Sequence, residues 1–108
     1  MEQIAKWTTP SIIYRPSTIS PSDIRTAVLC VKQHAKVVIE KDLTTALVEE
    51  KQVTWKLTQE ETGSLAECKE CAIGVDWVLN DGTRGRSNVG TFMVVGSGKD
   101  EALAWNEP

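Results

Sequence analysis

The sequence predicts an all-β protein, an antiparallel β-sandwich of about seven strands with one short helical turn. Short segments alternate apolar and polar side chains at every second residue, as strands with one buried face do. Turn-forming residues separate these segments at the close spacing that is typical of sandwiches. No long amphipathic helical pattern lies between them, as an alternating α/β fold would require.

Seven segments carry the strand pattern, and the clearest alternation runs along residues 70–79. There Ile73, Val75 and Trp77 share one face, while Gly74 and Asp76 lie on the other. The strands are expected at residues 11–15, 25–33, 36–41, 46–50, 52–58 and 70–79, with a return strand within 84–95.

The connections between strands have recognisable turn chemistry. A polar break at residues 34–35 predicts a hairpin, and Asp81-Gly82 predicts a second, two-residue hairpin turn, because both residues tolerate positive φ. Gly85 and Gly90 are expected at β-bulges in the return strand.

Thr58 followed by Glu61 resembles a capping box, and Gly63 follows as a helix stop. These three residues predict the single helical turn.

Length and composition indicate one folded domain. A chain of 108 residues with 41% apolar and 25% charged side chains has enough apolar surface for one core. The pattern starts at Pro10 and fades after Gly98. We therefore expect a single β-sandwich domain at residues 10–98, an N-terminal tail at 1–9 and a C-terminal tail at 99–108.

Charge and hydropathy exclude two classes of partner. The net charge is −3, and the basic side chains are scattered among acidic ones, which disfavours nucleic acid and anionic membranes. Apolar stretches such as residues 92–95 fall far short of the ~20 residues that cross a bilayer. The N-terminal residues do not match the pattern of a signal peptide. Three cysteines cannot all pair within one chain, so free thiols in a reducing compartment are expected.

Cys68 and Cys71 form a CxxC sequence, which is found in redox pairs and in zinc sites. Redox chemistry of the thioredoxin type requires a helix N-terminus after a strand, whereas this pair leads directly into a strand. A four-ligand zinc set would also need Cys30 and His34. Free thiols without a cofactor are the preferred interpretation.

The four tryptophans divide into two pairs. Trp55 and Trp77 lie on apolar strand faces, which predicts core positions. Trp7 and Trp105 lie in the predicted tails, where they would either anchor a neighbouring subunit or pack back onto the domain. A sugar-stacking surface, as in a carbohydrate-binding module, is an alternative for exposed rings.

No catalytic constellation is present in the sequence pattern. His34 lies at a predicted turn, where it is expected to be solvent-exposed, and no serine lies in a Gly-x-Ser-x-Gly motif. The sequence therefore predicts a protein that is not an enzyme.

The segments at residues 53–62, 75–79, 81–83 and 87–89 together resemble small prophage-encoded proteins of gut Firmicutes. The first of these reads VTWKLTQEET, and the others supply a strand, an Asp-Gly hairpin and the sequence SNV. The resemblance covers most of the chain, although the Cys68/Cys71 pair and the Trp-bearing C-terminal tail depart from it.

This resemblance implies an immunoglobulin-like β-sandwich encoded among virion morphogenesis genes, without an enzymatic role. It also implies a structural or accessory function, synthesis in the bacterial cytoplasm, and a further location in the virion. The expected partners are other phage or virion proteins, or a second copy of the chain. The alternatives that remain are a carbohydrate-binding module and a small CxxC zinc or redox protein.

Overall fold

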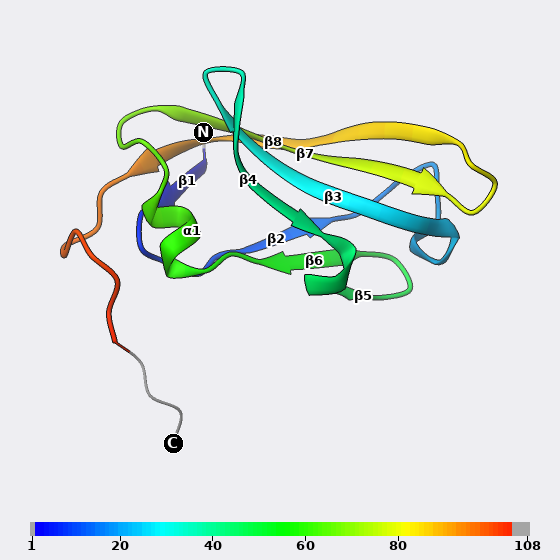
Figure 1. Ribbon diagram of the computed structural model, residues 1–108, viewed down its shortest axis with the longest axis horizontal. Coiled ribbons are helices and arrows are strands. Elements are labelled where there is room, and N and C mark those ends of the chain that lie inside the picture. The colour runs from blue at the N-terminus through cyan, green and yellow to red at the C-terminus, as the bar shows by residue number, and fades with distance from the viewer. Residues whose placement is uncertain (1, 105–108) are drawn as a thin grey trace.

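Two β-sheets pack face to face in the computed structural model, which describes residues 2–104 (Figure 1). The predicted all-β sandwich is confirmed. The five-stranded sheet has the order β1 (Glu2–Ala5), β8 (Arg84–Val95), β7 (Glu70–Leu79), β3 (Ile24–Gln33) and β4 (Lys36–Asp42). The three-stranded sheet has the order β2 (Ser11–Tyr14), β6 (Val53–Lys56) and β5 (Ala46–Val48).

The strand order is that of an immunoglobulin-like sandwich. If β2 to β8 are taken as strands B, C, C′, D, E, F and G, the two sheets become B-E-D and G-F-C-C′, as in immunoglobulin domains. The first strand differs from the constant-type arrangement, in which strand A lies beside B. Here β1 pairs in parallel with β8, in the opposite sheet. The position beside β2 is therefore not taken by any strand of residues 2–104.

The core lies between the two sheets and follows the predicted alternation. Leu29, Val31 and Val75 from the five-stranded sheet and Trp55 from β6 are all 0% exposed. The Trp55 indole N–H donates a hydrogen bond of 2.9 Å to the Asp42 carbonyl, so its buried polar atom is satisfied.

The N-terminal residues form part of the sheet, and the expected tail at residues 1–9 is wrong for residues 2–5. Glu2–Ala5 form β1, which pairs with residues 92–95 of β8, and the Ile4 side chain is only 4% exposed. A strand of four residues carries too little alternation to be recognised alone. Its partner lies near the other end of the chain, so the folded domain begins before Pro10.

The two predicted hairpins, β3–β4 and β7–β8, use different turns. His34 and Ala35 form the predicted two-residue β3–β4 turn, with positive φ values of 53° and 61°. The β7–β8 loop has three residues, not two, because the Leu79 N–H donates to the Thr83 carbonyl at 2.8 Å. Only Gly82 has a positive φ there, of 90°. This pattern of one left-handed residue at the end of the turn closes a three-residue loop.

Of the two glycines that were expected at bulges in β8, Gly90 lies next to a bulge. The register changes from Ile73–Gly90 to Gly74–Asn88, which places an extra residue, Val89, beside Gly90. Gly85 pairs regularly with Trp77, so no bulge occurs there.

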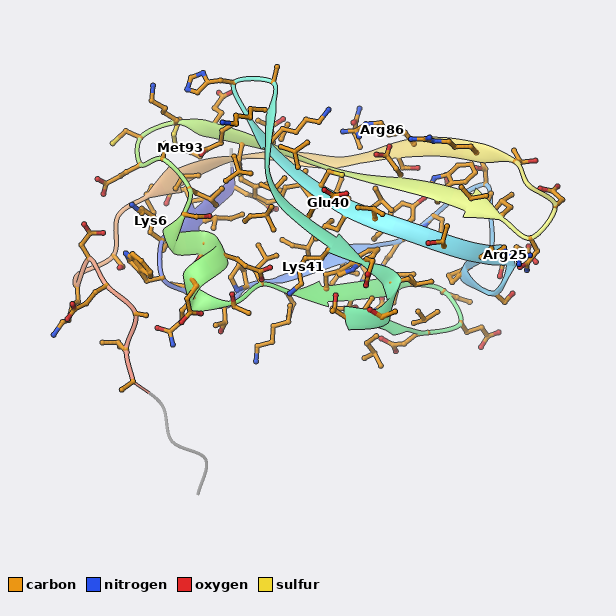
Figure 2. All side chains as sticks on the ribbon, in the orientation of Figure 1. Lys6, Arg25, Glu40, Lys41, Arg86 and Met93 are labelled. Carbon is orange, nitrogen blue, oxygen red and sulfur yellow. The ribbon has the colours of Figure 1, made fainter. Side chains whose placement is uncertain are left out.

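Two short 3-10 turns, η1 (Pro21–Asp23) and η2 (Leu43–Thr45), and one helix, α1 (Gln59–Gly63), connect the strands. The predicted capping box at the start of α1 is confirmed, because Thr58 and Glu61 bond each other's backbone N–H groups. Lys41, labelled in Figure 2, extends from β4 across to this helix. Its ammonium donates to the Lys56 carbonyl at 2.8 Å and to Glu61 Oε1 at 3.0 Å, which joins the two sheets at one side.

A buried side chain of β3 bonds to the segment between α1 and β7. The Gln33 amide is 6% exposed; it donates to the Ala66 carbonyl at 3.0 Å and accepts from the Ala66 N–H at 2.7 Å. This pair of hydrogen bonds fixes the residues that lead to the CxxC sequence.

Within residues 2–104, no helix is long and apolar enough to cross a membrane.

Candidate protein interface

The predicted zinc ligands are not brought together. Cys30 on β3 lies opposite Gly74 of β7, and Cys71 lies three residues from Gly74 along β7, which places its side chain on the other face of the sheet. Cys71 packs with Ile73 in the core between the sheets, whereas Cys30 lies on the outer face with Asp76, whose Oδ2 is 3.8 Å from its sulfur. The five-stranded sheet therefore separates these two thiols.

The other two residues of the zinc hypothesis lie at the surface. His34 is exposed at the tip of the β3–β4 hairpin, and Cys68 is exposed with a positive φ of 61° in the loop before β7. In the described part of the chain, no three His, Cys, Asp or Glu side chains lie close enough to hold a metal ion. Cys30 and Cys71 cannot bind the same metal ion, because successive strand residues point to opposite faces of a sheet and an odd number of positions separates Cys71 from Gly74, the residue opposite Cys30.

The buried thiols are poor nucleophiles. Burial, with further contributions from the Asp76 and Glu40 carboxylates, raises the pKa of the Cys30 thiol. Burial also raises the pKa of Cys71, although backbone hydrogen bonds at Phe92 oppose that shift. A raised pKa reduces the thiolate fraction at neutral pH, and the thiolate is the form that attacks disulfides and binds metals.

Trp7 packs back onto the domain. Its side chain is half-buried, its indole N–H donates to Asp100 Oδ1 at 2.9 Å, and its ring lies so close to Gly63 that a Cβ there would overlap it. These contacts tie β1, α1 and the C-terminal segment together. The second proposed anchor, Trp105, lies outside the described residues.

The strand tryptophans do not provide a flat sugar-binding surface. Trp55 is fully buried, and Trp77 is half-buried with its indole N–H donating to Ser87 Oγ at 3.3 Å. With Trp7 also partly covered, each tryptophan among residues 2–104 has packing contacts or a hydrogen bond within the domain. The carbohydrate-binding alternative has no support from these three rings.

With the zinc and sugar-binding sites unsupported, the free edge of β2 is the remaining candidate for a binding site. The Leu57 N–H donates to the Pro10 carbonyl at 2.9 Å, so Pro10 and Leu57 continue the β2–β6 register as a hydrogen-bonded pair. Hydrogen-bonded and non-hydrogen-bonded pairs alternate in antiparallel ladders. Ser11 and Ile13 are therefore in non-hydrogen-bonded pairs, and their N–H and C=O groups point away from β6.

Two hollows lie along this edge, between β2 and the five-stranded sheet. The first, of about 450 Å³, is lined by both apolar and polar residues of β1, β2 and β8 and of the segment before β2: Ile4, Ile12, Ile13, Val89, Phe92 and Pro10, with Glu2, Gln3 and Ser11. The second, of about 250 Å³, continues along β2 to Arg15, and Pro16 to Thr18 form its far end. Ile13 and Val89 line both hollows, so the two are adjacent.

A hydrogen bond between the sheets forms part of the second hollow. The Tyr14 hydroxyl and Ser87 Oγ, both lining it, are 2.9 Å apart. Arg15 also lines this hollow; its Nε donates to Gln52 Oε1 at 3.1 Å, and its guanidinium forms no ion pair with a carboxylate of the described residues. The edge thus combines backbone donors and acceptors, a partly apolar hollow and the positive charge of Arg15.

Comparison of the chain with protein-family models, with curated proteins and with solved structures found no match.

The sequence pattern does not distinguish this edge from the other strands. Ile13, which is 40% exposed, belongs to a segment predicted only as a strand. One signal was present: Pro10 and Pro16 bracket the segment, and proline in sheets is confined to edge strands and strand ends. Whether β2 is an edge strand depends on where β1 pairs, and the pairing of β1 was not predicted.

Proposed function

We propose that the protein is a non-enzymatic immunoglobulin-like module that binds other proteins, a prophage-derived structural or accessory protein associated with the virion or its assembly. The open edge of β2, with its two adjoining hollows, carries this proposal. Unpaired strand edges bind other chains through backbone hydrogen bonds. A soluble domain that keeps such an edge accessible risks aggregation unless a partner uses it.

The chemistry of the side chains supports a binding role over catalysis. The thiols of Cys30 and Cys71 are buried with raised pKa values, and His34 lies exposed on a hairpin tip. General acid–base or nucleophilic catalysis needs an activated group with a second group to orient it. Neither Cys30 nor Cys71 has the lowered pKa of an activated nucleophile.

The association with phage rests on the resemblance of residues 53–62, 75–79, 81–83 and 87–89 to small prophage-encoded proteins. On this proposal the partners are other phage or virion proteins, or a second copy of the chain, and the protein is made in the bacterial cytoplasm before it joins the particle.

Fractionation of induced phage particles tests the proposal. Lysates of the native host are separated on a density gradient, and the protein is quantified by mass spectrometry in particles, assembly intermediates and the soluble fraction. We expect it in particles or intermediates at a fixed ratio to a major structural protein. Its restriction to the soluble fraction, with no phage protein bound, would overturn the proposal.

A further inference from the structure

We propose that the partner supplies a β-strand, which pairs with the free edge of β2 and thereby completes the three-stranded sheet. The strand has apolar side chains at alternate positions and an acidic residue near one end. This inference rests on the proposed function and specifies its binding mode. Three observations carry it: the direction of the backbone groups of β2, the hollow beside this edge, and the charge of Arg15.

The first observation is the direction of the backbone groups. Ser11 and Ile13 direct their N–H and C=O groups away from β6, and the two residues are two positions apart. This is the spacing at which an added strand forms its hydrogen bonds. Because β1 pairs with β8, no strand of residues 2–104 occupies this position.

The second observation is the shape beside the edge. The side chains of an added strand alternate between the two faces of the sheet, so every second one points towards β8. The hollow of about 450 Å³ lies on this side, and its apolar part, formed by Ile4, Ile12 and Phe92, would surround an inserted aliphatic side chain. A segment with alternating apolar side chains fits this arrangement, whereas a helix would leave the edge amides unpaired.

The third observation is charge. Arg15, the residue that follows β2, lines the second hollow and has no carboxylate partner among the described residues. A carboxylate at the end of the added strand would accept charge-assisted hydrogen bonds from its guanidinium. This charge distinguishes one end of the edge from the other and so favours one direction of the added strand.

The test uses the isotope-labelled full chain and a synthetic peptide of ten residues that alternates valine and threonine and ends in aspartate. A peptide of the same composition with its valines grouped together serves as the control ligand. We expect the alternating peptide to bind more tightly than the grouped peptide. Exchange of the Ser11 and Ile13 amide protons should slow at least tenfold, while those of Ile12 and Tyr14 are slow in the free protein.

Two proline variants test whether the peptide binds at the free edge of β2. Ile13→Pro removes an N–H that points to the free edge of β2 and leaves the β6 hydrogen bonds in place. Val48→Pro is the matched control, because Val48 occupies the equivalent non-hydrogen-bonded position at the opposite edge of the same sheet. Ile13 and Val48 are similarly exposed, at 40% and 46%.

We expect Ile13→Pro to weaken peptide binding at least tenfold and Val48→Pro to change it less than twofold, with both variants folded by circular dichroism. Arg15→Gln should abolish the preference for a peptide ending in aspartate over one ending in asparagine. Equal weakening by both prolines, or protection of amides on β8 instead of β2, would overturn the inference. If the peptide fails to bind while the protein still fractionates with phage particles, the strand-addition inference is wrong and the proposed function stands.

Discussion

Gly85 shows how a single residue is fixed by close packing. It lies opposite Trp77 on β8, and a Cβ at this position would overlap the Trp77 ring. The glycine is therefore required by the tryptophan that lies over it, and the bulge predicted there does not form.

Gly85→Ala should lower the free energy of unfolding by about 1–3 kcal/mol, because Trp77 must move away from its position over β8. Gly98→Ala is the control, since nothing lies within 4 Å of its Cβ position, and it should change stability by less than about 0.5 kcal/mol. Urea unfolding followed by circular dichroism gives both values. Equal stability of the two variants would contradict the packing argument.

The three cysteines should differ in reactivity. Cys68 is exposed, whereas Cys30 and Cys71 are buried with raised pKa values. A thiol-specific chromogenic disulfide at pH 8 should therefore modify one thiol quickly in the native protein and all three in denaturant. Variants in which each cysteine is replaced by alanine identify the fast thiol. Rapid modification of two thiols would show that the core around Cys71 or the surface over Cys30 opens readily.

At the scale of elements, α1 depends on the network around Glu61. Burial alone would raise the pKa of Glu61, but hydrogen bonds from the Thr58 backbone N–H and the Lys41 ammonium outweigh burial and lower it below its usual value of 4.5. A carboxyl group with a depressed pKa in the folded state stabilises the protein above its unfolded pKa. This stabilisation is lost as the pH falls through the folded pKa.

Glu61→Gln should therefore be less stable than the wild-type protein at neutral pH and should lose less stability on acidification below about pH 4.5. Lys41→Met should reduce the acid dependence in the same direction, because it removes the ammonium that accompanies the carboxylate. Thermal melts between pH 2 and pH 7 measure both effects. Identical acid dependence in all three proteins would mean that the Glu61 contacts are not maintained in solution.

The contribution of β1 to the stability of the protein follows from the burial of Ile4. Ile4 is 4% exposed and packs in the main core, although only four residues of β1 pair with β8. Ile4→Ala should cost about 2–4 kcal/mol, which is typical of truncating a buried aliphatic side chain. Exposed Gln3→Ala in the same strand is the control and should cost less than about 0.5 kcal/mol. If neither substitution changes stability by more than about 0.5 kcal/mol, residues 1–9 behave as a tail and β1 does not contribute to the fold.

At the scale of the whole molecule, the topology requires distant parts of the chain to meet. β1 pairs with the end of β8, so the sheet cannot be completed until residues 2–5 and 92–95 are in contact. Domains dominated by such non-local pairings fold in milliseconds to seconds, more slowly than helical bundles.

We expect a single cooperative unfolding transition in which tryptophan fluorescence and far-ultraviolet circular dichroism coincide, since Trp55 is completely buried between the sheets. Refolding measured by stopped-flow fluorescence should take milliseconds to seconds. An earlier transition in one probe would indicate that β1 or the three-stranded sheet unfolds separately.

The sequence by itself determined the fold class, the positions of most strands, the β3–β4 turn and the capping box of α1. Each of these depends on residues close together in the chain: alternation along residues 70–79, two residues at a hairpin tip, or Thr58 and Glu61 in one helical turn. It also predicted Trp55 as a core residue, because a large apolar side chain on the apolar face of a strand is buried.

The tertiary structure decided which residues meet across the chain, and with that the candidate site. It placed Cys30 and Cys71 on opposite faces of one sheet, and it tied Trp7 to Asp100. It also paired β1 with β8, which left the edge of β2 open beside two hollows. Local patterns do not encode these features, because the choice of a strand's partner is made by the packing of the whole core.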